Sequence, residues 1–163
     1  MKSKVKVSVM FVCMGNICRS PTAHGVFRKL VQDEGYTDQV YIESSGTHAY
    51  HVGESPDQRA QQTARGRGID LSDLRAQKVK AADFASFDYI LAMDSDNFAM
   101  LSMNCPAEFQ HKLHMFLDFA ESRNQREVPD PYYGGASGFD HVFDLVEEGS
   151  RGLLDDIIHK HGL

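Results

Sequence analysis

The chain has 163 residues and a net charge of −6, and it has no run of Lys and Arg, so nucleic acid is not expected as a partner. With 42% hydrophobic residues it can fold as one domain over residues 1–163 with its own core. It has neither a signal-peptide pattern nor an apolar run of about 18 residues, so we expect no membrane partner and a cytoplasmic location. Three cysteines make no disulfide framework, which favours a reducing compartment.

The hydrophobic pattern alternates between strands and helices along the chain. Strands are predicted at 5–12, 40–43, 87–93 and 113–117, and helices from Ser20 to Gly35, from Asp57 to Gly66 or Gly68, from Ser95, and from Phe139 onward, with a short helical turn at 81–84. Residues 118–138 are predicted to form a long loop. This alternation predicts an α/β fold with a small parallel sheet and helices on both faces.

The first strand ends at Cys13, and Arg19, Ser20 and Pro21 begin the following helix. A loop between a strand and a helix N-terminus points N–H groups and the positive end of the helix dipole at one spot, which suits an anion. The same groups, together with Arg19, favour the thiolate form of Cys13. The Arg19 fork can bind two phosphate oxygens at once. A nucleophile and a phosphate cradle in one loop predict phosphoryl transfer through a phosphocysteine.

Within this loop, Cys13 followed by five residues, Arg19 and Ser20 resembles the phosphate loop of protein tyrosine phosphatases, and its N-terminal place resembles the low-molecular-weight class. Further similar stretches are 44–47, 53–57, 87–94 and 130–134, so the resemblance covers nearly the whole chain. It implies a four-stranded parallel sheet of Rossmann-like type (phosphotyrosine protein phosphatase I). It also implies hydrolysis of phosphotyrosine and small aryl phosphates, phosphotyrosine-containing proteins as partners, and no cofactor.

The residues between Cys13 and Arg19 are expected to bind the phosphate through their backbone. Gly15 lets the backbone approach the phosphate, and Asn16 tolerates a left-handed conformation and can hold the shape of the loop. Ser20 can donate to the Cys13 thiolate and ease its departure. The predicted phosphate-binding residues are Met14, Gly15, Asn16, Ile17, Cys18, Arg19 and Ser20.

A phenolate leaving group calls for a proton donor, and Asp130 is the candidate general acid and base. From the residues alone, Asp130-Pro131 fits the start of a turn as well as it fits a catalytic role. The resemblance to the family implies the catalytic role. The resemblance also implies that Tyr132 and Tyr133 flank the pocket, stack on the substrate ring and can be phosphorylated. Tyr50 is expected on the opposite wall, with Met14 and Ile17 as apolar sides.

Several residues are expected to support or regulate the loop. The resemblance implies a reversible protective disulfide between Cys13 and Cys18 during oxidation, whereas Cys105 is expected to be a buried apolar residue. Ser44 matches the position that hydrogen-bonds to the loop asparagine in the family. Asp73 stands where mammalian members carry a histidine, which puts this supporting network in question. Asp94 and Asn97 either support the loop or cap a helix, and capping is favoured.

Other functions remain as alternatives at this point. Arsenate reductases share the loop, but they need further cysteines, and residues 70–100 contain none. Protein-arginine phosphatases resemble a version with Thr in place of Ile17. A non-catalytic phosphotyrosine-binding module would need neither Cys13 nor Asp130.

The histidine pairs His48–His51 and His111–His114 lack the partners of a metal site, and the second pair is expected on opposite faces of a strand. A monomer or a weak dimer through Tyr132 and Tyr133 is expected.

Overall fold

Four strands and their connecting helices make up the part of the chain that the structure describes. The computed structural model describes residues 5–120, 125–131 and 136–163. The elements in chain order are β1 (Val7–Cys13), α1 (Arg19–Asp33), β2 (Val40–Gly46), α2 (Gln58–Gly66), α3 (Asp83–Ser86), β3 (Tyr89–Ala92), α4 (Ser95–Asn104), the 3₁₀ helix η1 (Ala107–Lys112), β4 (Leu113–Met115), the 3₁₀ helix η2 (Phe116–Phe119) and α5 (Ala136–His161).

All strand pairs in the sheet are parallel, and the strand order is β2-β1-β3-β4. The predicted fold class is therefore confirmed. β1 lies between two neighbours, which explains why its residues are apolar on both faces: Val7, Val9, Phe11 and Val12 are fully buried. The chain passes from β1 through α1 to β2 on one side, while β3 lies on the other side. The end of β1 is thus the switch point at which open α/β sheets bind ligands.

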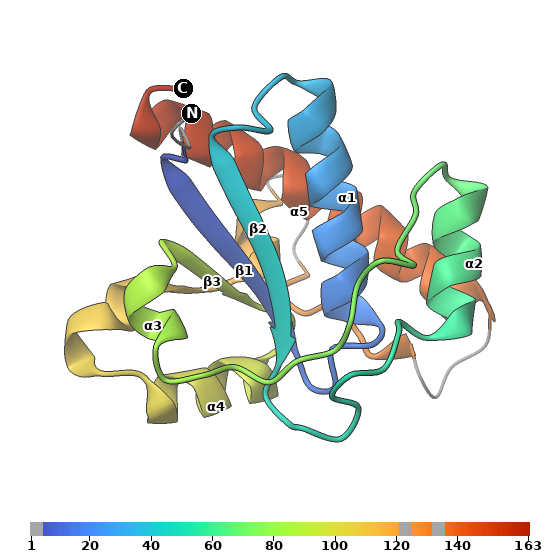
Figure 1. The fold of residues 1–163 in the computed structure, drawn as a ribbon, viewed down its shortest axis with the longest axis horizontal. Coiled ribbons are helices and arrows are strands. Elements are labelled where there is room, and N and C mark those ends of the chain that lie inside the picture. Colours follow the sequence, from blue (N-terminus) through green and yellow to red (C-terminus); the bar gives the residue numbers. More distant parts are fainter. Residues whose placement is uncertain (1–4, 121–124, 132–135) are drawn as a thin grey trace.

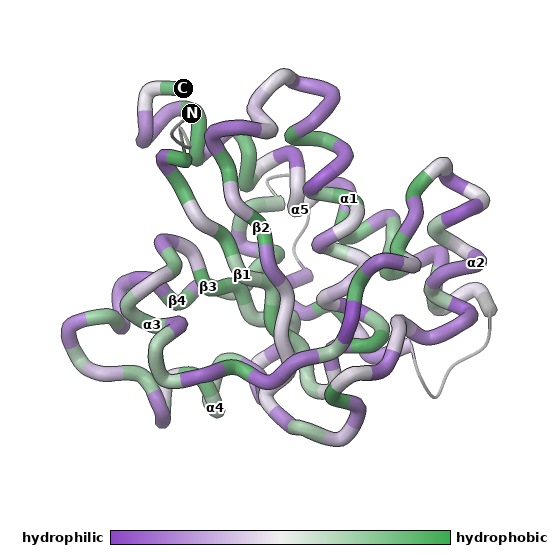
Figure 2. Tube along the Cα trace, in the orientation of Figure 1, coloured by the Kyte–Doolittle hydropathy of each residue, from purple (hydrophilic) through white to green (hydrophobic). Residues whose placement is uncertain are grey.

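Helices cover both faces of the sheet, as Figure 1 shows. α1, α2 and α5 lie on one face, where α5 contacts both α1 and α2, and α3, α4 and η1 lie on the other. In the core of the first face, the Phe11 ring meets Phe27 and Phe116 edge-on. Most residues within β1 are hydrophobic, whereas most residues of α2 are hydrophilic (Figure 2). The two packed layers hold β1 rigidly, and with it the loop at its end.

The boundaries differ from the predicted ones where backbone pairing overrides the hydrophobic pattern. β2 continues to Gly46 because its polar residues Ser44 and Ser45 pair with β1. β4 stops at Met115, since the chain then turns into η2, and η1 was not predicted at all. His111 lies in η1, before β4, so the prediction that His111 and His114 occupy opposite faces of one strand was wrong. α5 begins at Ala136, which shortens the predicted loop.

Among the described residues, none of the helices combines the length and apolar character needed to cross a bilayer.

Candidate active site

The loop between Cys13 and Arg19 is fixed from outside by the backbone of the segment that follows β2. Thr47 N–H donates to the Cys13 carbonyl (2.9 Å), and His48 N–H donates to the Met14 carbonyl (3.0 Å). A side chain at Gly46 would place its Cβ 2.7 Å from the Met14 carbonyl oxygen, so only glycine permits this approach. The loop is therefore preformed by the fold.

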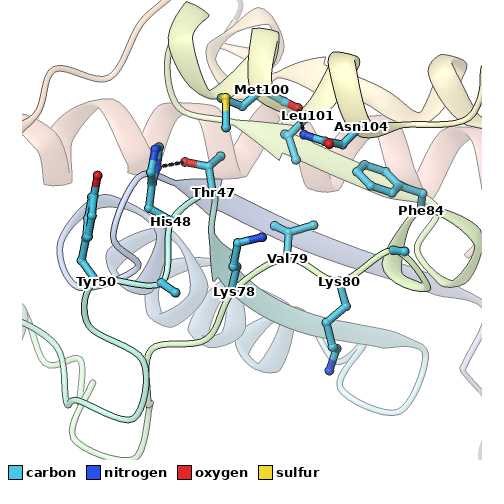
Figure 3. A pocket seen from close by; sticks show the side chains of 12 residues that line it. Thr47, His48, Tyr50, Lys78, Val79, Lys80, Phe84, Met100, Leu101 and Asn104 are labelled. Atoms are coloured by element: carbon cyan, nitrogen blue, oxygen red, sulfur yellow. Dashed lines mark hydrogen bonds between the residues drawn. The ribbon is translucent and has the colours of Figure 1, made fainter.

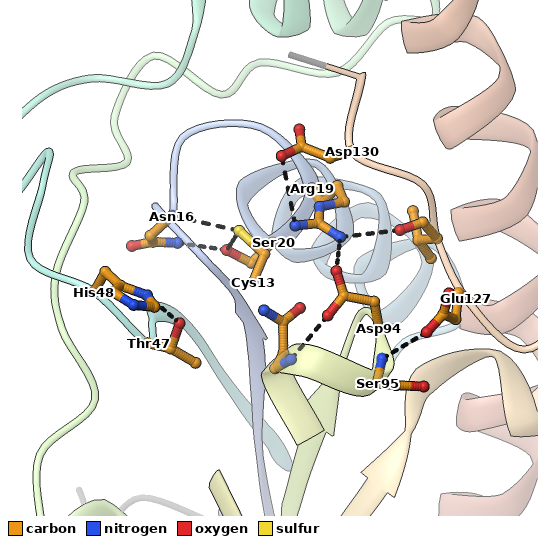
Figure 4. A network of polar contacts seen from close by, with 12 residues as sticks. Cys13, Asn16, Arg19, Ser20, Thr47, His48, Asp94, Ser95, Glu127 and Asp130 are labelled. Carbon is orange, nitrogen blue, oxygen red and sulfur yellow. Dashed lines mark hydrogen bonds and ion pairs between the residues drawn. The ribbon is translucent and has the colours of Figure 1, made fainter. Parts of the chain in front are cut away.

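Two donors converge on the Cys13 sulfur (Figure 4). Asn16 N–H lies 3.3 Å from Sγ, and the Ser20 hydroxyl oxygen lies 3.0 Å from it. The Asn16 side-chain amide donates to the same hydroxyl oxygen at 2.7 Å, which leaves the single Ser20 proton free to point at sulfur. The Ser45 carbonyl is a more distant acceptor, at 3.4 Å. Asn16 and Ser20 thus hold the Cys13 sulfur at the mouth of the loop through two contacts.

Asn16 adopts the predicted left-handed conformation, with φ of 59°. Its side-chain oxygen accepts from Gln77 N–H at 2.9 Å. Ser44 does not make the predicted hydrogen bond to Asn16, because the Ser44 hydroxyl pairs instead with Nδ1 of His24, at 3.0 Å. Asp73 does not replace the family's histidine either, since it forms an ion pair with Arg28. In the described residues, Ser20 and Gln77 support Asn16.

His24, the partner of Ser44, is buried in α1. Burial, reinforced by the nearby Arg28 cation, lowers its pKa to about 4, and the more weakly felt Asp73 carboxylate opposes this shift. At neutral pH the His24–Ser44 pair is therefore an uncharged hydrogen bond behind the loop.

The Arg19 guanidinium is almost completely buried, with a side-chain exposure of 4%. One terminal nitrogen donates to Asp94 at 2.6 Å and to the Val128 carbonyl at 3.0 Å. Burial by itself would lower the pKa of Arg19, but Cys13, Asp94 and Asp130 together raise it. Asp94 also accepts from Asn97 N–H at 2.8 Å at the start of α4. The two alternatives weighed for Asp94 thus hold together: it caps α4 and orients Arg19.

Asp130 lies near the second terminal nitrogen of Arg19, 3.9 Å away, and its side chain is 30% exposed. The preceding residues anchor it, because Val128 is fully buried and its N–H donates to the Met93 carbonyl at 2.8 Å. Glu127 accepts from Ser95 N–H at 2.8 Å. This places a partly exposed carboxylate beside the phosphate loop. Tyr132 and Tyr133 lie outside the described residues.

A cavity of about 200 Å³ opens beside the loop. The structure brings together the predicted Tyr50, Met14, Ile17 and Asp130, and the full lining is Cys13, Met14, Gly15, Ile17, Cys18, Arg19, Tyr50, His51 and Asp130. Tyr50 is 68% exposed and its ring stacks on His48, with centroids 5.0 Å apart. Sequence reasoning missed His51 as a wall residue. Its position directly after Tyr50 in the same loop was the available signal.

Cys18 differs from Cys13 although both line this cavity. Burial, and then the nearby Asp57, Cys13 and Asp130, raise the pKa of the Cys18 thiol. Cys18 is therefore a neutral thiol at ordinary pH, and the loop carries one nucleophile. All three cysteines are unpaired, so the disulfide between Cys13 and Cys18 stays a prediction.

No group of three metal-binding side chains occurs within residues 5–120, 125–131 and 136–163.

Comparison with known proteins assigns a family to this arrangement. The family model described as "Low molecular weight phosphotyrosine protein phosphatase" matches residues 8–162. The chain belongs to this family. A putative low molecular weight protein-tyrosine-phosphatase of Synechocystis sp. is 43% identical and covers 93% of this chain and 96% of its own length. The low molecular weight phosphotyrosine protein phosphatase of Sus scrofa is 39% identical, with coverage of 96% and 99%.

A solved structure carries the same fold as this low molecular weight phosphotyrosine protein phosphatase. The protein tyrosine phosphatase of Entamoeba histolytica, crystallised with Hepes in the active site, superposes with a TM-score of 0.91 at 38% identity, covering 97% of this chain and all of that one. The family and the enzyme class predicted from the sequence are thus confirmed. Family membership implies phosphotyrosine proteins as the substrate class.

Proposed function

We propose that this enzyme cleaves phosphotyrosine in two steps, with Cys13 as the nucleophile. In the first step the Cys13 thiolate attacks phosphorus, and the bond from phosphorus to the tyrosine oxygen breaks. Asp130 gives its proton to that oxygen, which leaves as the neutral phenol. Arg19 and the N–H groups of residues 14–19 bind the phosphoryl oxygens, whose charge is redistributed in the transition state.

In the second step, water replaces sulfur on the phosphorus. Asp130, now a carboxylate, takes a proton from the water molecule, whose oxygen attacks the phosphocysteine. The bond from phosphorus to sulfur breaks, and Ser20 donates its hydroxyl proton as a hydrogen bond to the departing thiolate. Inorganic phosphate leaves, and Cys13 and Asp130 return to their starting states.

The observation that carries this proposal is the convergence of two donors on Cys13 Sγ beside a locked guanidinium. A residue that served only in packing would need neither the 3.3 Å contact to Asn16 N–H nor the 3.0 Å contact to the Ser20 hydroxyl. Arg19 is held in place by Asp94 and by the Val128 carbonyl, which orients its guanidinium as a fixed donor.

The remaining expectations are part of the same proposal. We infer one domain over residues 1–163, supported by a family match over 8–162. We further infer that the substrates are phosphotyrosine-containing proteins, that nucleic acid and membranes are not partners, and that the chain is a monomer or weak dimer in the cytoplasm. A reversible disulfide between Cys13 and Cys18 fits this compartment, since both thiols are free and face one cavity.

Hydrolysis of p-nitrophenyl phosphate and of a phosphotyrosine peptide, without added metal, tests the mechanism. We expect Cys13→Ser to lower both rates by at least about 10⁴-fold, because a hydroxyl is a far weaker nucleophile than a thiolate. Asp130→Ala should slow the peptide by about 10²-fold or more, and p-nitrophenyl phosphate much less, because p-nitrophenolate leaves without a proton.

Each other outcome has a distinct meaning. Full activity in Cys13→Ser would disprove thiolate attack. An inactive wild type that still binds the peptide would favour a binding module, and faster cleavage of phosphoarginine than of phosphotyrosine would favour the arginine phosphatase. Equal losses on both substrates in Asp130→Ala would contradict its role as the proton donor.

A further inference from the structure

A second, larger depression lies beside the candidate active site and is not used by the proposed chemistry. It has a volume of about 700 Å³, against about 200 Å³ for the cavity at Cys13. Tyr50 lines both, so the two hollows adjoin at one aromatic side chain. Volumes of this size are typical of sites for ligands, and the smaller cavity accommodates little beyond a phosphorylated ring.

The groove has an apolar floor between two segments far apart in the sequence. Val79 and Phe84 come from the segment around α3, and Met100 and Leu101 come from α4, as Figure 3 shows. Phe84 and Leu101 are almost fully buried, so the floor is part of the folded core and does not depend on a ligand for its shape. Such a surface suits an apolar side chain.

The rim of the groove is cationic, although the whole chain has a net charge of −6. Lys78 is exposed and its ammonium points toward α4 over the groove (Figure 3). Lys80 lies two residues further along, but its ammonium points away. Within the described part of the chain, Lys78 has no ion-pair partner. An unneutralised cation beside an apolar floor is complementary to a carboxylate that follows or precedes an apolar residue.

We propose that this groove binds the substrate chain next to the phosphotyrosine, and that it selects an apolar residue with an acidic residue beside it. This inference rests on the proposed function, because Tyr50 connects the groove to the phosphate site. The occupant is an extended segment of the substrate protein. Its apolar side chain lies over Val79 and Leu101, and its carboxylate pairs with Lys78.

The test uses phosphotyrosine peptides that differ only in the two residues next to the phosphotyrosine. These two residues are Leu and Glu, Leu and Lys, or Ser and Glu. Each pair is placed before the phosphotyrosine in one peptide and after it in another. We expect the wild type to cleave the Leu–Glu peptide about fivefold more efficiently than the Leu–Lys peptide on one of the two sides, through a lower KM. The Ser–Glu peptide should be cleaved about threefold less efficiently than Leu–Glu, because it leaves the floor uncovered.

Lys78→Glu should abolish or reverse the preference for the Leu–Glu peptide, while p-nitrophenyl phosphate, which has no flanking residues, is cleaved at an unchanged rate. Lys29→Glu is the matched control, because it makes the same change of charge on α1, on the other face of the sheet. Lys80→Glu should have an effect between the two.

The failure of this proposal is separable from the failure of the proposed function. Normal cleavage of p-nitrophenyl phosphate that depends on Cys13, combined with equal cleavage of all peptides, would overturn the groove and leave the chemistry intact. The same holds if Lys78→Glu and Lys29→Glu change the peptide preference equally. Loss of the Cys13-dependent reaction itself would overturn both.

Discussion

The cavity at Cys13 and the groove at Lys78 share Tyr50 but are built in different ways. The polar groups that act in the cavity are mostly buried and already paired: Arg19 with Asp94, and Ser20 with Asn16 and Cys13. In the groove the charged group is an exposed lysine, Lys78, over an apolar floor. Chemistry needs donors fixed before the transition state forms, whereas recognition of a flanking chain tolerates mobile charges.

Among the fixed hydrogen-bond donors of the cavity, we expect the largest effect at Arg19. Arg19→Lys keeps the charge but cannot both pair with Asp94 and bind phosphate through two parallel donors. We expect kcat/KM for p-nitrophenyl phosphate to fall by about 10²- to 10³-fold, as when one fixed oxyanion donor is lost. Arg126→Lys, on an exposed pair with Asp118, is the control and should change nothing. A loss below tenfold in Arg19→Lys would show that geometry matters less here than charge.

The buried residue His24, which lies behind the cavity, predicts that the folded state is less stable at acidic pH. The pKa of His24 is lowered to about 4, so the folded chain resists protonation of a residue that the unfolded chain protonates near 6.5. The contribution of neutral His24 to the free energy of unfolding is fully present above pH 6.5 and is lost as the pH falls toward 4. Between pH 7 and pH 5 the loss due to His24 should be about 2 kcal/mol in the free energy of unfolding.

Urea unfolding of the wild type, His24→Gln and His159→Gln at both pH values measures this loss. His24→Gln should remove most of the His24 contribution, while the exposed His159→Gln should behave as the wild type does. An unchanged pH dependence in His24→Gln would mean that the His24–Ser44 pair is not kept neutral by the fold.

A smaller effect is expected from substitution of Ser20, which should slow the second step of the reaction more than the first. Ser20→Ala removes the hydroxyl that lies 3.0 Å from Cys13 Sγ. We expect kcat to fall about tenfold, the scale of one hydrogen bond to a charged group. A rapid initial release of p-nitrophenol should appear, because loss of the thiolate becomes the slow step. Thr22→Ala, whose hydroxyl bonds to the Cys18 carbonyl, is the control on the same helix.

The smallest effect is expected at the residue common to both regions. Tyr50→Ala removes an exposed ring that lines the cavity and the groove. KM should rise about two- to fivefold for p-nitrophenyl phosphate and more for the Leu–Glu peptide, because only the peptide uses both regions. Tyr41→Ala, outside both, is the control. A rise confined to p-nitrophenyl phosphate would separate the two regions.

Much of the candidate site could be predicted because it depends on neighbours along the chain. Cys13 ends β1, Asn16 lies in the short loop, and Arg19 and Ser20 begin α1, so a strand, a loop and a helix start that follow directly in the sequence sufficed to bring their groups together. The start of the second helix was predicted at Asp57 for the same reason, and Asp57 does cap α2 by accepting from Arg59 N–H. Local spacing determines local geometry when few residues intervene.

Contacts between distant segments could not be predicted in this way. The partner of Ser44 is His24 rather than Asn16, because α1 and β2 are packed together. The side-chain oxygen of Asn16 accepts from the Gln77 backbone N–H instead. The joint role of Asp94 also needed the packed structure, since 75 residues separate it from Arg19.

By itself, the amino-acid sequence determined the parallel α/β fold, the phosphate loop and the family. The tertiary structure alone decided that His51 faces the loop, that Cys18 is a neutral thiol, and that Lys78 lies over an apolar groove joined to the active site through Tyr50. The physical reason is that burial and charge environment depend on which surfaces pack together. Hydrophobic periodicity places a residue on a face of its own element, but it does not identify the element packed against that face.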